Sequence, residues 1–241
     1  MISFFSTKKN ISEVEWLGVD VHNHLLPGID DGAIDIVQSI SFIKALNELG
    51  FHKFICTPHI FTELYPNTTE TITQALMDVK AALAKTELNV EVNAAAEYMV
   101  DETFKLTKNL LCLPGQHILI EMSYLSEMPQ IEQVIFDLQL AGFKVILAHP
   151  ERYFFYHKKP ERYERLKDMG VLFQLNLLAL SGYYGPEVKL AAGYLLKKHY
   201  YDFAGTDLHH QKHLKALQDF ICSGGLYKMI GHYPFKNKAL F

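Results

Sequence analysis

Short apolar runs alternate with amphipathic stretches along almost the whole chain. In the stretch 36–50, Ile36, Ile40 and Ile43 recur at helical spacing, and Gly50 then provides a C-terminal stop. Further helical patterns lie at 76–83, 129–141, 160–169, 186–199 and 211–222. Runs typical of β-strands span 15–24, 53–59, 88–98, 117–123, 143–150, 171–176 and 201–207.

This alternation of strand and helix predicts parallel strands that are covered by helices. Seven strand-like runs in 241 residues favour an α/β barrel, incomplete or distorted, and a doubly wound open sheet is the competing architecture. A chain of this length commonly folds as one domain. We therefore expect a single domain over residues 19–241, preceded by an N-terminal arm at 1–18.

Polar residues with metal-ligand or related chemistry stand at the end of every predicted strand. In barrels of this kind the carboxyl ends of the strands converge at one mouth, where the chemistry collects. Chance placement of histidines and acidic residues would rarely produce this pattern. In chain order, the strand ends carry His22 with His24, His59, Glu97, Glu121, His149, Asn176, and Asp207 with His209.

The spacing within two of these pairs places both side chains on one side of a strand. Side chains alternate along a strand with a period of two, so His22 and His24 point to the same face. Asp207 and His209 repeat this spacing at another strand end. Two imidazoles on one face can bind one ion, although such a pair on its own is more often solvated or part of a core.

Carboxylates extend the candidate ligand set. Glu97 follows a run of small residues, and Glu121 follows the buried-looking run 117–120. A carboxylate at the end of such a run is costly without a partner, and a cation is the natural one. Imidazole and carboxylate ligands together suit Mn, Fe or Zn. The whole set is too large for one ion and predicts a multinuclear centre suited to displacement at phosphorus: His22, His24, Asp31, His59, Glu97, Glu121, His149, Asp207 and His209.

Charge and composition argue against several other classes of protein. The net charge of −4 gives no general field that would favour nucleic acid. No apolar run approaches the roughly 18–20 residues of a membrane span. The N-terminal segment does not read as a secretory signal, because its lysines follow a short apolar part instead of preceding it. Three cysteines provide no disulfide framework, and we expect a cytoplasmic protein.

Six motifs together resemble a known family. They are "DVHNHLLPGIDDGA", "CTPH", "AAEY", "IEMS", "AHPERY" and "GTDLHH". The pattern resembles the polymerase-and-histidinol-phosphatase (PHP) superfamily and, within it, the metal-dependent bacterial protein-tyrosine phosphatases of the capsular and exopolysaccharide, CpsB-like type. The resemblance implies a distorted (β/α)7 TIM-like barrel, the PHP fold, with three divalent metal ions. Manganese is the first candidate, with iron or zinc as alternatives.

The resemblance also implies how the ligands divide among the ions. Asp31 and Glu121 stand where many superfamily members have histidines, and these carboxylates match the tyrosine-phosphatase branch. Arg152 would contact the substrate phosphate, and a guanidinium fork suits phosphate oxygens; the alternative is a surface ion pair with Glu151 or Glu161. The first ion would be held by His22, His24, Glu97 and Asp207, the second by Glu97, Glu121 and His149 with Glu97 bridging, and the third by Asp31, His59 and His209.

The implied activity is hydrolysis of phosphotyrosine by a metal-bound hydroxide. Asp207 and His209 are the nearest candidates for proton transfer, although both are also implied as ligands. The substrate would be the tyrosine-rich tail of a bacterial tyrosine kinase that controls polysaccharide synthesis, and relatives of this type also form homo-oligomers. Two alternatives stay open: a small-molecule phosphoesterase of the histidinol-phosphatase type and a non-catalytic metal-binding module.

The remaining candidate residues have simpler interpretations. A cysteine phosphatase needs Cys-x5-Arg, and none of the three cysteines has an arginine six residues on. We expect His210 and His213 to be solvated and Asp30 to serve a turn or cap. Tyr184 would pack on the surface or overhang the mouth. Asn176 would bind substrate or a metal water, or hold its loop.

Overall fold

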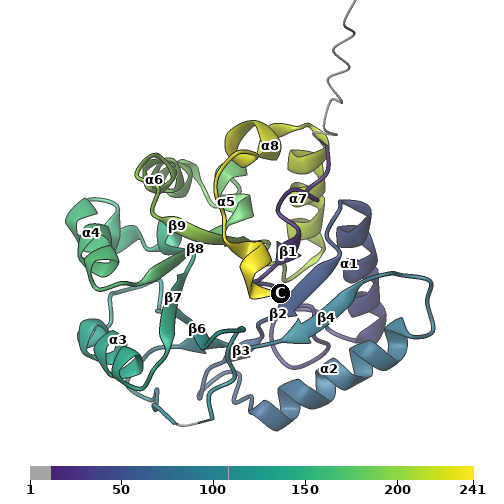
Figure 1. Cartoon of the computed structure of the whole chain (residues 1–241), viewed down its shortest axis with the longest axis horizontal. Helices are drawn as coiled ribbons and strands as arrows, with labels where there is room; N and C mark the ends of the chain where they lie inside the picture. The colour runs from purple at the N-terminus through teal and green to yellow at the C-terminus, as the bar shows by residue number, and fades with distance from the viewer. Residues whose placement is uncertain (1–11, 108) are drawn as a thin grey trace, which may run out of the picture.

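The computed structural model describes residues 12–107 and 109–241, and it forms a ring of parallel strands with helices on the outside (Figure 1). One sheet has the order β1-β2-β4, with β1 at Val19–Asp20, β2 at Lys53–Cys56 and β4 at Glu91–Ala94. The other has the order β3-β5-β6-β7-β8-β9. Its strands are β3 (His59–Ile60), β5 (Glu97–Met99), β6 (His117–Glu121), β7 (Lys144–Ala148), β8 (Leu172–Asn176) and β9 (Tyr201–Gly205).

Strand order in both sheets follows chain order, without the reversal that a doubly wound sheet requires. The predicted α/β barrel is therefore confirmed in a distorted form, and the open-sheet alternative is wrong. The predicted helices are also present: α1 (Ile36–Glu48), α2 (Thr69–Leu83), α3 (Ile131–Leu140), α4 (Pro160–Asp168), α6 (Pro186–Lys197) and α7 (Gln211–Cys222). Two short helices were not predicted, α5 (Leu177–Ser181) and α8 (Gly225–Ile230).

The second and third predicted strands are each divided in two, which corrects the prediction that His59 and Glu97 end them. His59 begins β3 and Glu97 begins β5. Pro58 has no N–H to donate to the ladder, and the His59 N–H donates to the Asp30 carboxylate over 3.1 Å instead of to a strand. The ladder is therefore interrupted between β2 and β3, close to the mouth of the barrel.

The period-two pattern of the strands separates two apolar clusters. In β6, Ile118 and Ile120 belong to the large core beneath the helices, whereas Leu119 belongs to a smaller cluster that fills the barrel interior. Glu121 has the same parity as Leu119, so it extends the inner face toward the mouth. The inner cluster thus forms an apolar floor below the polar strand ends, with Val19, Val21, Ile55, Ala95, Leu113, Leu119, Ile146, Ala148, Phe203 and Leu240 as members.

The described end of the predicted N-terminal arm packs on the barrel. Val14 and Leu17 are buried in the large core, and the Val14 N–H donates to the Leu49 carbonyl over 2.9 Å. The predicted arm otherwise falls on residues 1–11, which lie outside the described part, and a boundary at residue 18 stays a prediction. Among the helices of residues 12–107 and 109–241, none combines the length and apolarity needed to cross a membrane.

Side chains join β1 to β9, the first and last strands, and so close the ring. Buried Asn237 donates its amide to the carbonyls of Val19 and Ala204 over 2.7 and 2.6 Å, and it accepts from the Ala204 N–H over 3.0 Å. Asp20 on β1 accepts from both the N–H and the hydroxyl of Thr206. The C-terminal turn that carries Asn237 therefore lies close to β1 (Figure 1).

We predict that Asn237→Ala lowers the free energy of unfolding by about 2–4 kcal/mol, because it leaves buried backbone groups of two strands without partners. Urea unfolding monitored by circular dichroism measures the change. Lys238→Ala, an exposed position on the same turn, serves as the matched control and should change stability by less than about 0.5 kcal/mol. Equal stability of the two variants would contradict closure of the ring by this side chain.

Candidate metal centre

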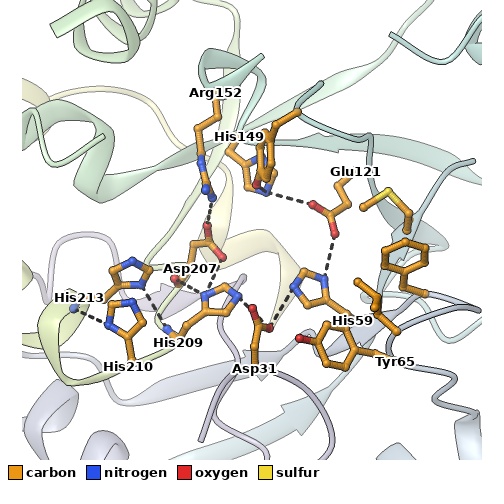
Figure 2. Close-up of a pocket in the computed structure, with 14 residues that line it drawn as sticks. Asp31, His59, Tyr65, Glu121, His149, Arg152, Asp207, His209, His210 and His213 are labelled. Atoms are coloured by element: carbon orange, nitrogen blue, oxygen red, sulfur yellow. Dashed lines mark hydrogen bonds and ion pairs between the residues drawn. The ribbon is translucent and has the colours of Figure 1, made fainter. Parts of the chain in front are cut away.

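The nine predicted ligands converge at the carboxyl end of the barrel. Six of them line a pocket of about 510 Å³ (Figure 2), namely Asp31, His59, Glu121, His149, Asp207 and His209. The donor atoms of all nine form four overlapping groups, and within each group all donors lie within 4.8 Å of one another. These groups are His24, Asp31, His59 and His209; His22, His24 and Asp207; His22, Glu97 and His149; and His59, Glu97 and Glu121.

Glu97 occupies the middle of this cluster and is completely buried. Its Oε2 lies 3.2 Å from His22 Nε2, 3.4 Å from His24 Nε2 and 3.1 Å from His59 Nδ1. Its Oε1 lies 3.2 Å from His149 Nε2. One carboxylate thus faces four imidazoles, two that follow β1, one that begins β3 and one that follows β7, which is the position expected of a bridging ligand.

Polar partners fix the rings of the first two histidines. Gln174 Oε1 lies 2.8 Å from His22 Nδ1 and also accepts from the His149 N–H. Asp30 Oδ2 lies 2.8 Å from His24 Nδ1. In both rings the Nδ1 therefore carries the proton, and the Nε2 lone pair points into the cluster, as such outer partners arrange for metal-binding histidines.

Asp30 is thus more than the turn or cap residue that the sequence suggested. Its side chain is fully buried, and the Oδ1 oxygen accepts from the Gly32 N–H while Oδ2 serves the His24 ring and the His59 N–H. Contacts with His24 outweigh burial and hold the pKa of this carboxyl well below its usual value. Asp31 beside it is half exposed and faces His59 and His209.

The backbone is strained at two of the converging residues. His149 has φ 34° and Asp207 has φ 50°, in the left-handed region that non-glycine residues rarely adopt. Such conformations cost on the order of 1–3 kcal/mol and persist where the surroundings fix them. The Asp207 N–H is held by the His22 carbonyl at 2.8 Å.

Glycine permits the close approach of β9 to the first histidine. A Cβ on Gly205 would lie 2.6 Å from the Cβ of His22 and 3.0 Å from its backbone nitrogen, so no larger residue fits there. Gly32 similarly leaves space for the His24 carbonyl, which a Cβ would approach to 2.1 Å.

Buried donor atoms without hydrogen-bond partners test whether the cluster fits metal ions. Among the described residues, the unpartnered buried side-chain atoms include His59 Nδ1, Glu97 Oε2 and Asp207 Oδ1, which all face the cluster. His59 Nδ1 is only 2.9 Å from Glu121 Oε1, yet it makes no hydrogen bond of acceptable geometry. Donor atoms that converge at these distances need positive charge between them, so the donor set fits divalent ions.

The pKa values show the same concentration of charge. Burial alone would raise the pKa of Glu97 and Asp207, but the nearby histidines, His22 first among them, lower both well below the usual range. Burial lowers the pKa of His59, whereas Glu121 and Glu97 raise it, with a net rise to about 10. Protons thus take the place that a cation would fill in this cluster.

Arg152 points to Asp207 rather than to the acidic residues considered from sequence (Figure 2). Its Nη1 donates to Asp207 Oδ2 over 2.9 Å, so the alternative of a surface pair with Glu151 or Glu161 is wrong. Glu151 is instead buried and accepts from the Asn176 N–H and the Tyr201 hydroxyl. The Arg152 guanidinium lines the pocket beside the predicted ligands.

The contacts of three other residues near Asp207 and Arg152 were only partly anticipated. Asn176 donates its amide to Asp207 Oδ2 over 2.7 Å and to the Tyr184 hydroxyl over 3.1 Å. His213 is buried, not solvated, and burial lowers its pKa to about 4. His210 is exposed as predicted, and its ring caps α7 by accepting from the His213 N–H. No residue spacing in the sequence indicated these contacts.

The cysteines do not contribute to the centre. Cys56 is buried in the large core, and burial raises the pKa of its thiol. Cys112 and Cys222 do not line the pocket. A thiolate mechanism therefore has no support in this structure.

Comparison with known proteins identifies similar molecules. The family model described as capsular polysaccharide synthesis, CpsB/CapC, matches residues 18–233. The tyrosine-protein phosphatase YwqE of Bacillus subtilis (strain 168) is 30% identical over 198 residues, which cover 80% of this chain and 78% of YwqE.

Solved structures agree with these sequence matches. Crystal structures described as YwqE from Bacillus subtilis and CpsB from Streptococcus pneumoniae, unique metal-dependent tyrosine phosphatases, provide a match with a TM-score of 0.79 and 26% identity. That match covers 92% of this chain and 90% of the other. Histidinol phosphate phosphatase from Lactococcus lactis has a TM-score of 0.51 at 12% identity, over 87% of this chain and 94% of the other, which shows a shared fold.

We predict that Asp30→Asn weakens binding of Mn²⁺ by about 10–100-fold, because the His24 ring loses the carboxylate that orients it. Competition with a fluorescent chelator measures this affinity without reference to catalysis. Asp78→Asn, an exposed position on α2, is the matched control and should bind Mn²⁺ like the unmodified protein. Unchanged affinity in the Asp30 variant would refute its role in orienting the ring.

Proposed function

Because the chain belongs to the capsular polysaccharide synthesis family CpsB/CapC, we propose that it is a metal-dependent protein-tyrosine phosphatase. The observation that carries this proposal is the convergence of nine imidazole and carboxylate side chains on the buried Glu97, with Arg152 at the edge of the same pocket. A degenerate, non-catalytic relative would have no reason to keep every donor of the set.

We assign the donors to three divalent ions, with manganese preferred and iron or zinc as alternatives. His22, His24, Glu97 and Asp207 would hold one ion, Glu97, Glu121 and His149 a second, and Asp31, His59 and His209 a third. Two observed groups support the first and third sets, because His22 and His24 lie with Asp207, and Asp31 lies with His59, His209 and His24. Glu97 lies with His22 and His149 in one group and with His59 and Glu121 in another, so the second set departs from the observed grouping. Bound divalent ions supply Lewis acidity and lower the pKa of water toward roughly 7.

The residues of the chain itself bind and orient the substrate. Arg152 provides planar N–H donors for two phosphate oxygens, and its charge offsets the charge that develops as the ester bond breaks. Asp207 and His209 are our candidates for proton transfer. The phenol of tyrosine has a pKa of about 10 and leaves more readily than an alcohol, so the demand on a general acid is modest.

One wall of the pocket suits an aromatic leaving group. Phe61, Leu64, Tyr65 and Met99 line the side formed by β5 and the loop after β3. Leu64 is 65% exposed, which leaves apolar surface available to a ring. This wall favours a phosphorylated tyrosine over a polar metabolite such as histidinol phosphate.

We propose that the substrate is a phosphotyrosine protein, in particular the tail of a bacterial tyrosine kinase that acts in capsule or exopolysaccharide synthesis. The family description and the names of the relatives support this choice. We place the protein in the cytoplasm, where its three free cysteines would stay reduced, and we expect it to form a homo-oligomer.

The direct test is hydrolysis of a phosphotyrosine peptide by protein that has been stripped of metal and then supplied with Mn²⁺ in steps. Phosphate release should follow the added metal. The double variant His22→Ala, His24→Ala should lose activity by at least about 10³-fold, since it removes two donors of the cluster. The matched control His52→Ala, His232→Ala removes two exposed histidines and should retain activity.

Parallel assays with histidinol phosphate distinguish the alternatives. Faster turnover of histidinol phosphate than of the peptide would favour a small-molecule phosphatase. Metal binding without hydrolysis of any aryl phosphate would favour a non-catalytic module. Absence of both metal binding and hydrolysis would overturn the proposal altogether.

We further predict that Arg152→Ala raises KM for aryl phosphates by about 10–100-fold, because it removes a charged pair of hydrogen bonds to the phosphate. Arg152→Lys should recover only part of this loss, since an ammonium lacks the planar fork. Metal content determined by mass spectrometry provides the control and should stay constant. An unchanged KM in both variants would place phosphate binding elsewhere.

A further inference from the structure

Two tyrosine rings enclose the guanidinium of Arg152. Its Cζ atom lies 4.5 Å from the centroid of the Tyr124 ring and 4.3 Å from that of the Tyr184 ring, over the face of each. Tyr124 follows β6 and Tyr184 follows α5, so the two rings come from different β/α units. The arginine is thus held between elements that are distant in the sequence.

We propose that Tyr124 and Tyr184 are positioning residues that hold Arg152 ready for the substrate phosphate. This inference rests on the proposed phosphatase function and on the role assigned there to Arg152. The two tyrosines would act on the arginine through their ring faces and need not touch the phosphate themselves.

The chemistry of the two rings suits this task. A ring face attracts the positive charge without accepting a hydrogen bond from the edge of the guanidinium, and without neutralising the charge as a second carboxylate would. Among the described residues, only Asp207 accepts a hydrogen bond from the guanidinium, at Nη1. A guanidinium carries five N–H donors, so several stay available for phosphate oxygens.

Each ring is itself fixed by the centre. The Tyr184 hydroxyl accepts from the Asn176 amide over 3.1 Å, and the same amide donates to Asp207 Oδ2 over 2.7 Å. The Tyr124 hydroxyl lies 3.4 Å from His149 Nε2. The hydroxyl of each ring is therefore held by the cluster or by a residue bonded to it, and this contact fixes where the ring lies against the arginine.

The contact between the arginine and the rings is partly shielded from water. The Arg152 side chain is only 20% exposed, although Tyr124 is 38% exposed. A cation–π contact is stronger where water is excluded. Loss of one ring should therefore loosen the guanidinium measurably.

The test compares Tyr124→Leu and Tyr184→Leu with the corresponding phenylalanine variants. In each leucine variant, KM for p-nitrophenyl phosphate and the inhibition constant of inorganic phosphate should both rise about tenfold, whereas kcat changes less. Tyr124→Phe retains the ring face and should recover phosphate affinity. Tyr184→Phe should recover it in part, because the Asn176 amide loses one of its two acceptors.

A double-mutant cycle separates positioning from a merely structural role. On an Arg152→Ala background, either leucine substitution should cause no further loss of phosphate affinity, because the group that it positions is absent. Tyr183→Leu is the matched control, since this neighbouring ring packs edge-on against Tyr184 and is not stacked on the arginine. It should retain the phosphate affinity of the unmodified protein.

Two outcomes would overturn the inference. One is a leucine variant with unchanged metal content and unchanged affinity for phosphate. The other is a loss of affinity that persists in full on the Arg152→Ala background. If a leucine variant does not fold, Tyr124→Met and Tyr184→Met provide flexible apolar replacements for the same cycle.

Failure of the proposed function can be recognised separately. Calorimetric titration of the manganese-loaded protein with inorganic phosphate measures the role of the two tyrosines even if no aryl phosphate is hydrolysed. Hydrolysis by the unmodified protein without any effect of the rings would reject the inference and leave the phosphatase intact.

Discussion

The arrangement of this molecule depends on one electrostatic constraint, which is the burial of Glu97 among imidazoles at the mouth of a barrel. Its carboxylate oxygens lie 3.1–3.4 Å from four histidine nitrogens and make few ordinary hydrogen bonds with them. Burying a carboxylate without compensation costs several kcal/mol. The cluster is therefore stable with protons or cations between its donors, and divalent ions suit the mixed nitrogen and oxygen set best.

The barrel meets this constraint by separating an apolar floor from a polar mouth. The period of two places Leu119 in the interior cluster and Glu121 directly above it on the same face of β6. Where the regular strand cannot aim a side chain, the backbone departs from it, as in the left-handed conformations of His149 and Asp207. The strain at these two positions is balanced by packing and hydrogen bonding around them.

Much of this could be predicted from the sequence, because period-two alternation and polar strand ends are local signals. They predicted the barrel and every candidate donor except Asp31, which does not stand at a strand end, and the resemblance supplied the division among ions. Contacts between distant segments left no such signal. Asp30 looked like an ordinary turn residue, and its bonds to the His24 ring and the His59 N–H exist only once β2 and the first loop are side by side. The burial of His213 depends in the same way on tertiary packing, and so does the pairing of Arg152 with Asp207.

Asp207 connects the cluster of candidate ligands to Arg152, because its two oxygens face different neighbours. Oδ1 lies 3.4 Å from the ring nitrogens of His22 and His209, whereas Oδ2 accepts from both Arg152 and Asn176. If the guanidinium turned toward a phosphate, as proposed, Oδ2 would retain the amide of Asn176 and would not be left without a donor. The arginine could then be shared between the protein and the proposed substrate at small cost. Asn176 would make that exchange possible, although it binds neither metal nor phosphate in the proposed function.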